Sequence, residues 1–388
     1  MNAAILLARA SPRVRDDCIT SRLGRFTWRH RAAVSSLAGR HARLADLAVS
    51  FPALLFALAV PRRRFDPEPV IERAIAGAPL SELAAAADMP MWTRRLGPET
   101  FQRSLPRLPD SPLFRRQIAN HPPASAKTAA LWLDTVASTA FWGHEGLAVW
   151  FARRVGKRED WEALRRWQLI TLWAWHAANP TAPASRFVRT PWTPDISTRA
   201  ALVAARDWKE NVTAALELGD RVVADAWADP AVVDGYSFEP IQTLVELIDG
   251  SHALDNCVRT YAAAIAGDSQ RLWIVKRDGA PVAMLGLEAH PVPSIFEISG
   301  VSNSRVPPEI ALTAHRWFRE HAPLQVIKGT TYAGTSRKRW AGMWRGYWLA
   351  KRLFPRWLPL APVESLYFWL EEPRQRRRHR RRLRVLPV

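Results

Sequence analysis

The sequence predicts an α+β protein, in which a mostly helical N-terminal half precedes a module of a helix, a small antiparallel sheet and a covering helix. Two observations predict this class. In the first half, apolar residues recur at helical spacing, and the runs end at proline or glycine. Beyond Tyr236 the period changes to that of strands, and two of the segments flank an Asp-Gly turn.

The length and composition allow several domains. The chain has 388 residues, of which 48% are hydrophobic, enough for two or three cores of ordinary size. We expect a basic arm with an apolar helix over residues 1–65 and a Trp-rich helical domain over 66–195. The α+β module covers 196–335, and a Trp- and Arg-rich extension with a disordered basic tail covers 336–388.

The helical half begins with an apolar run, Leu44–Val60. At 17 residues it is at the short limit for a membrane span, it contains Asp46 and Pro52, and the arginines after it suit a cytoplasmic flank. A buried helix broken at Pro52 explains the run as well. Membrane association through this run is therefore kept as an alternative.

Further helices are predicted from their end signals. Asp66–Pro69 begins a helix that ends at Gly77, and a helical hairpin follows over Pro79–Leu96. Proline-rich segments at 106–123 and 180–194 bracket a Trp-rich helical block, in which burial explains most of the tryptophans. The pattern is helical again over Thr198–Asp229.

The module is predicted element by element. Helices are expected over Ile241–Leu247 and His252–Ala266, the second capped by Asp249 or Ser251 and ended by Gly267. The expected strands are Arg271–Arg277, Ala280–Glu288, Ile295–Ile298 and Leu324–Ile327, with a turn at Asp278-Gly279 and a helix over Pro308–His321.

The charge points to a polyanionic partner. The formal net charge is +19, and nearly all of the basic residues are arginines, which bind phosphate well. Eight arginines lie within Arg374–Arg384. We expect this tail to bind nucleic acid non-specifically, chiefly through Arg376, Arg377, Arg378, Arg380, Arg381 and Arg382.

Cysteine usage suggests a reducing compartment. Cys18 and Cys257 are too few for a disulfide framework, and no Cys/His spacing resembles a zinc site. We therefore expect a cytoplasmic protein with no metal site and no cofactor.

Cys257 is the candidate nucleophile, with His252 as its candidate base. On one helix, five residues of separation rotate the two side chains about 140° apart, which argues against the pair. Leu254, Cys257, Val258 and Tyr261 instead share one face. This spacing favours a buried structural cysteine, with a reactive thiol as the alternative.

Four polar residues lie near this cysteine in the predicted module. Asn256 is expected to face solvent, and Asn303 follows Gly300 in a tight loop. Glu288 and Glu297 lie at or near the ends of neighbouring strands, where paired carboxylates run acid/base chemistry or simply face water.

The order of these elements resembles the PcfJ-like family: a glycine, Asn-Cys-Val with a following tyrosine, a hairpin ending in an acidic residue, and Gly-x-x-Asn. The match covers roughly residues 240–325. The matching residues are Gly250, Leu254, Asn256, Cys257, Val258, Tyr261, Gly267, Arg277, Pro281, Glu288, Gly300 and Asn303. The resemblance implies association with conjugative plasmids, phages and other mobile elements, but it implies no reaction.

Three positions depart from the family pattern. The family more often has His at Asn256, Thr at Gly286 and Gln at Glu297. The missing histidine removes an adjacent base for Cys257. We take Asn256, Glu297 and Arg277 as binding candidates.

These observations lead to three hypotheses of function. The first is a nucleic-acid-associated accessory factor. The second is an enzyme with Cys257, Glu288 and Asn303 in its active site, and the third is a membrane-associated protein.

Overall fold

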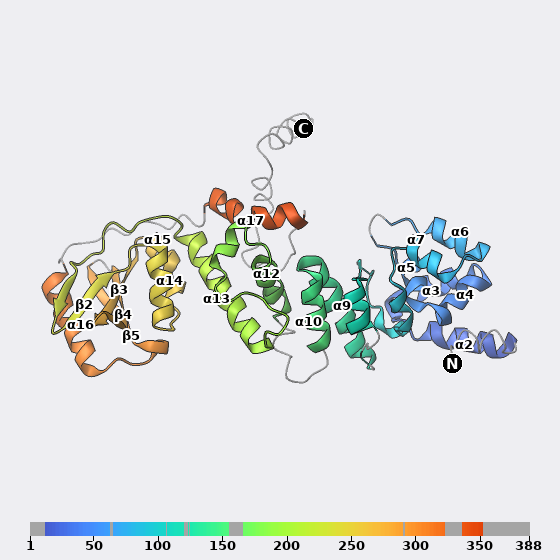
Figure 1. Cartoon of the computed structure of the whole chain (residues 1–388), viewed down its shortest axis with the longest axis horizontal. Helices are drawn as coiled ribbons and strands as arrows, with labels where there is room; N and C mark the ends of the chain where they lie inside the picture. Colours follow the sequence, from blue (N-terminus) through green and yellow to red (C-terminus); the bar gives the residue numbers. More distant parts are fainter. Residues whose placement is uncertain are drawn as a thin grey trace, which may run out of the picture. The chain divides into compact units, whose positions relative to one another are not determined.

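The computed structural model describes residues 12–62, 65–105, 107–119, 123, 125–154, 166–289, 292–322 and 336–351 (Figure 1). They form many helices and a five-stranded antiparallel sheet, so the protein is α+β, as the sequence predicts. The chain divides into two compact units. Residues 1–175 and 192–202 belong to the first unit, and residues 176–191 and 203–388 belong to the second.

The described part of the first unit is helical. Its helices are α2 (Pro12–Gly24), α3 (Trp28–Gly39), α4 (Ala42–Ser50), α5 (Pro52–Ala59), α6 (Glu68–Ala76), α7 (Leu80–Ala86), α9 (Ala126–Trp142) and α10 (Glu145–Arg154). Short helical turns cover Met91–Arg95, Pro98–Thr100, Pro112–Phe114 and Arg115–Ala119. The predicted helix that ends at Gly77 is confirmed as α6, because Gly77 takes a left-handed φ of +92° that closes it.

The apolar run Leu44–Val60 forms two helices rather than one. α4 ends at Ser50 and α5 begins at Pro52, because proline has no N–H to continue the first helix. The ring of Phe56 stacks on Phe101 at 5.4 Å, inside the core of the unit. None of the helices in the described ranges combines the length and apolarity that a membrane crossing requires.

Tryptophan burial, predicted for the Trp-rich block, is confirmed for Trp132, Trp150, Trp173 and Trp175, whereas Trp142 and Trp167 are half-buried. Trp132 on α9 is 1% exposed, and its indole N–H donates to the carbonyl of Ala152 on α10. Trp173, on α12 (Trp167–Ala177), is fully buried. These side chains therefore serve the packing of the helices.

The helical part of the second unit surrounds a buried histidine. It contains the end of α12, the turn Pro183–Phe187, most of α13 (Thr198–Glu217) and α17 (Arg337–Lys351). The His176 ring stacks on Trp208 and meets the edge of Trp344, with centroids 5.1 and 5.7 Å apart. Complete burial lowers the pKa of His176 to about 3.

The sheet is an antiparallel meander in chain order. Its strands are β1 (Ala231–Val233), β2 (Tyr236–Pro240), β3 (Gln270–Arg277), β4 (Ala280–Ala289) and β5 (Pro293–Ser299). The β3–β4 hairpin turns at Asp278-Gly279, as predicted, with φ values of +51° and +78°. β1 and β2 were not predicted, although Asp234-Gly235 supplies the same turn with φ of +49° and +78°.

Helices cover the two faces of this sheet (Figure 1). On one face, α16 (Pro308–His321) buries Trp317 against Trp273 and Phe238. On the other face, Gly250 of α14 (Leu244–Ala253) lies over Met284 of β4. The covering helix Pro308–His321 is confirmed to the residue.

Three predicted elements differ from the structure, and a fourth is not covered by it. The expected helix Ile241–Leu247 is displaced, because Thr243 and Glu246 form a capping box that begins α14 at Leu244. The expected helix His252–Ala266 is interrupted, and only a 3₁₀ turn, Val258–Tyr261, and α15 (Ala262–Ala266) remain of it. The helix over Thr198–Asp229 ends at Glu217, and Leu324–Ile327 lies outside the described residues.

Candidate functional site

Two loops of the second unit meet where the sequence motif lies. One is Leu254–Cys257, after α14, and the other is Val301–Asn303, after β5. The Ser302 N–H donates to the carbonyl of Leu254 at 2.7 Å, and its hydroxyl donates to the carboxylate of Asp255 at 3.0 Å. Asp255 and Ser302 have φ of +45° and +53°, so both loops turn through the left-handed region.

Cys257 lies at the surface of this contact. Its thiol is 3.9 Å from Oδ1 of Asn303, which is also exposed. The prediction that Cys257 faces the core is wrong. The chain leaves the helix at Leu254, so the regular spacing is lost, and only Leu254 and Val258 of the expected apolar face are fully buried.

Tyr261 and Glu297 form a hydrogen-bonded pair beside the cysteine. The Tyr261 hydroxyl donates to Oε2 of Glu297 at 2.6 Å, and its ring meets the edge of Phe296 with centroids 5.4 Å apart. The hydrogen bond to Glu297 and burial raise the pKa of Tyr261 to about 12, and the charge of Cys257 adds to the effect. The tyrosine is thus held protonated as a donor.

Asn256 is buried, contrary to the prediction that it faces solvent. It is 5% exposed, and Oδ1 accepts from the backbone N–H of Val258 at 3.4 Å. Its carbonyl accepts from the Ser251 hydroxyl at 2.6 Å, and this bond closes the turn after α14. Asn256 therefore shapes the loop that presents Cys257.

Two predicted residues lie apart from this group. Arg277 donates to the Tyr236 hydroxyl at 3.1 Å and lies 3.6 Å from Glu309, at the hairpin end of β3. Glu288 is paired with Gln270 in the sheet register, and no hydrogen bond in the described part of the chain joins it to the cysteine. The tail residues Arg376, Arg377, Arg378, Arg380, Arg381 and Arg382 lie outside the described residues.

A buried arginine organises the polar interior next to the motif. Arg259 is 8% exposed, and Nη1 donates to Asp207 at 2.5 Å and to Asn211 at 2.7 Å. Nη2 donates to Glu210 at 2.7 Å. We call Arg259, Asp207, Glu210, Asn211 and His252 the Arg259 cluster. It fastens the segment after α14 to α13.

His252 belongs to this cluster and not to the cysteine. Its Nε2 lies 3.4 Å from Asp207 and 3.4 Å from Nη1 of Arg259. Burial is the largest cause that lowers the pKa of His252, and the positive charge of Arg259 lowers it further. His252 therefore does not pair with Cys257, and the reason is its contact with Asp207 and Arg259 rather than rotation along one helix.

Sequence reasoning missed the Arg259 cluster. Asp207, Glu210 and Asn211 share one face of α13 at helical spacings of three and four, and this polar stripe was the available signal. Their partner is 48 to 52 residues away in the sequence. Nothing local in the sequence connects the two segments.

The geometry supports hydrogen bonding at the motif more directly than it supports a reaction. Cys257, Asn303, Tyr261 and Glu297 lie on one side of the module, with a thiol at the surface and a tyrosine held protonated. In the described ranges, no three His, Cys, Asp or Glu side chains are grouped to hold a metal ion. No protein-family model, curated protein or solved structure matches the chain.

Proposed function

We propose that this protein is a PcfJ-like accessory factor of mobile genetic elements that binds nucleic acid without sequence specificity. The observation that carries the proposal is the net charge of +19, which arises from 55 basic and 36 acidic residues. Such an excess of positive charge attracts phosphate backbones, and the guanidinium group of arginine donates two hydrogen bonds to phosphate oxygens. The PcfJ-like assignment rests on the order of motif residues between Gly250 and Asn303.

The beginning of α3 supports this function. Trp28 is 77% exposed, and the guanidinium of Arg29 lies 5.4 Å from its ring centroid. Arg31 follows, and no acidic residue occupies the first turn. Basic residues here oppose the helix dipole, while a bound phosphate complements both the dipole and the arginines. An exposed ring beside arginines suits a stacked base of a single strand.

The exposed face of α17 adds a second basic surface. The helix contains five basic residues and no acidic residue. Trp340 and Trp344 pack inward, whereas Arg337 and Lys338 are exposed. The buried tryptophans thus anchor a helix whose outer side favours polyanions.

Fluorescence anisotropy with a labelled 20-nucleotide single strand tests the proposal. Deleting residues 374–388 removes eight arginines. Since each phosphate contact adds about 0.7 to the salt slope on single strands, the loss of several contacts flattens the slope by about 3 or more. Unchanged affinity and slope after the deletion contradict the role given to the tail.

A second variant examines the stacking surface. Trp28→Ala removes the exposed ring, and base stacking is worth about 1–3 kcal/mol per base, so affinity for the single strand falls at least fivefold. Leu312→Ala is the control, because Leu312 is also exposed, at 70%, on α16. Equal affinities of the two variants would remove Trp28 from the interface.

Two experiments test the cytoplasmic location and the link to mobile elements. We place the protein in the cytoplasm, where its nucleic acid is found, and cell fractionation checks this. Crosslinking followed by sequencing of the recovered DNA checks the link to mobile elements. Recovery of plasmid or phage sequences in no excess over chromosomal DNA contradicts it.

An enzyme is the second candidate, favoured by the exposure of Cys257 next to Asn303. Iodoacetamide labels Cys257 in the native protein, and Cys257→Ser removes that label. Cys18→Ser is the matched control, since Cys18 is only partly exposed. A native protein whose Cys257 resists labelling until it unfolds contradicts this candidate.

A further inference from the structure

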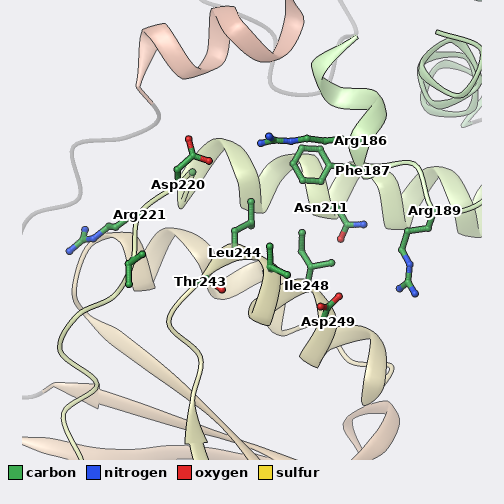
Figure 2. Close-up of a pocket in the computed structure, with 13 residues that line it drawn as sticks. Arg186, Phe187, Arg189, Asn211, Asp220, Arg221, Thr243, Leu244, Ile248 and Asp249 are labelled. Atoms are coloured by element: carbon green, nitrogen blue, oxygen red, sulfur yellow. The ribbon is translucent and has the colours of Figure 1, made fainter. Parts of the chain in front are cut away.

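A cavity opens between α13 and α14 within the second unit (Figure 2). Its volume is about 470 Å³, which is in the range of small-molecule sites. Phe187, Leu244, Val245 and Ile248 line it with apolar surface. Leu244 and Ile248 are one helical turn apart on α14, and Figure 2 shows both side chains directed toward α13. The walls therefore suit an apolar body.

The cavity is held open by contacts that need no ligand. Asn211 lines it, and its Oδ1 accepts from Arg259 at 2.7 Å. The Arg259 cluster thus fixes α13 relative to the segment that follows α14. At the far end, Arg221 is bound to both carboxylate oxygens of Asp268 at 2.7 Å. A preformed cavity binds its ligand without the cost of ordering the walls.

Two arginines of the rim remain available to a ligand. Arg186 lies over the Phe187 ring, 4.7 Å from its centroid, and is exposed. Arg189 is exposed as well, and it shares no hydrogen bond or ion pair with the residues that the structure describes. Its positive charge nevertheless lowers the pKa of His252 in the Arg259 cluster.

Acidic residues on the same rim limit the charge that a ligand can carry. The lining contains three arginines and two aspartates, Asp220 and Asp249. Arg221 is already paired with Asp268, so the formal charges of Arg186 and Arg189 balance those of the two aspartates. The cavity therefore accommodates one anionic group beside Arg189, whereas the aspartates disfavour a polyanion.

We propose that this cavity binds a small amphipathic monoanion, with its apolar body against Leu244, Val245 and Ile248 and its anionic group at Arg189. The ligand class is an aliphatic or aromatic body that ends in one carboxylate, sulfonate or monoester phosphate. This site goes beyond nucleic-acid binding, because its described lining includes neither Trp28 nor the basic residues of α17.

The probe for the test is 1-anilinonaphthalene-8-sulfonate, which has an aromatic body and one sulfonate. Its fluorescence is titrated with the full chain. Arg189→Gln weakens binding about fivefold, the size expected for one exposed charge pair. Val245→Glu abolishes binding of the probe, because it places a carboxylate in the apolar wall of the cavity. Val245 is 66% exposed, so the chain accepts this carboxylate without unfolding. Circular dichroism melting verifies that each variant is folded.

Two further variants fix the sign of the ligand charge. Asp249→Asn removes a repulsive carboxylate and strengthens binding of the probe about twofold. Arg319→Gln is the matched control on α16, outside the cavity, and leaves binding unchanged. Equal binding by Arg189→Gln and the wild type overturns the proposal. Weaker binding by Asp249→Asn also overturns it and points to a zwitterion instead.

Competition separates this site from the nucleic-acid surface. Decanoate and decyl phosphate displace the probe, and their relative strength distinguishes a carboxylate from a phosphate ligand. Decyltrimethylammonium, which has the same body and the opposite charge, does not displace it. Displacement by a 20-nucleotide single strand but not by decanoate overturns the proposal and assigns the cavity to nucleic acid. Arg189→Gln leaves the anisotropy titration unchanged, so the two proposals fail separately.

Discussion

Replacing Arg259 with methionine removes the central cation of a buried cluster while it keeps an unbranched apolar stem in place of the aliphatic part of arginine. The substitution leaves Asp207 and Glu210 without their donor. Glu210 is 41% exposed and can turn to water, whereas Asp207 is 23% exposed and stays partly desolvated. Breaking a buried ion pair costs about 3–5 kcal/mol, so with one carboxylate still able to hydrate we expect about 3 kcal/mol.

The free energy of unfolding is measured by urea titration, followed by near-ultraviolet circular dichroism. Arg316→Met is the control, because Arg316 pairs with Asp234 at 2.8 Å while the two side chains are 50% and 45% exposed. Loss of that pair costs less than about 1 kcal/mol. If the two variants lose the same stability, the reasoning about the Arg259 cluster is wrong.

A second variant separates the charge from the packing. Asp207→Asn combined with Arg259→Met recovers part of the lost stability, because no carboxylate is left without a partner at this position. The pKa of His252 rises in Arg259→Met, since the neighbouring positive charge lowers it in the wild type. Titration of the imidazole signals by nuclear magnetic resonance detects that change.

Three other predictions concern single contacts. Gly286→Ala places a Cβ 2.5 Å from the Phe296 ring. We expect a loss of about 1–3 kcal/mol in the free energy of unfolding, measured by urea titration. Adding Phe296→Ala to the same chain relieves the clash. Glu297→Gln lowers the pKa of Tyr261 from about 12 toward 10, seen by absorbance at 295 nm; an unchanged titration would exclude Glu297 as the cause. The pKa of His176 in the folded chain is about 3, below the ordinary value of 6.5. The unfolded chain therefore takes up the proton at a higher pH than the folded chain does, and the free energy of unfolding falls from pH 6.5 toward pH 3. His176→Phe removes up to about 4 kcal/mol of this acid destabilisation, and urea titrations at several pH values measure it.

The sheet was largely predictable because its signals are local. The segments 271–277 and 280–288 are rich in apolar residues, and the turn at Asp278-Gly279 fixes the register between β3 and β4. The beginning of α14 was also readable from Thr243 and Glu246, although the apolar spacing pointed three residues earlier. The Asp234-Gly235 turn was an equally clear signal for β1 and β2.

The site was less predictable because distant contacts decide it. The helix before Cys257 ends in a turn held by Ser251 and by a hydrogen bond from Ser302, which is far along the chain. A regular helix would have buried the thiol, and the interrupted one exposes it. The partners of Arg259 lie on α13, so the pattern around the motif does not reveal them.

The connection between β2 and β3 is much longer than the other connections of the meander. β1–β2, β3–β4 and β4–β5 are joined by two or three residues, whereas 29 residues separate β2 from β3. Asn256, Cys257 and Tyr261 all lie in that long connection. Insertions and substitutions there leave the pairing of the strands unchanged, so related chains can diverge in what they recognise while they keep the same sheet. Comparing the length of this one segment among relatives would show which of them keep the same recognition surface.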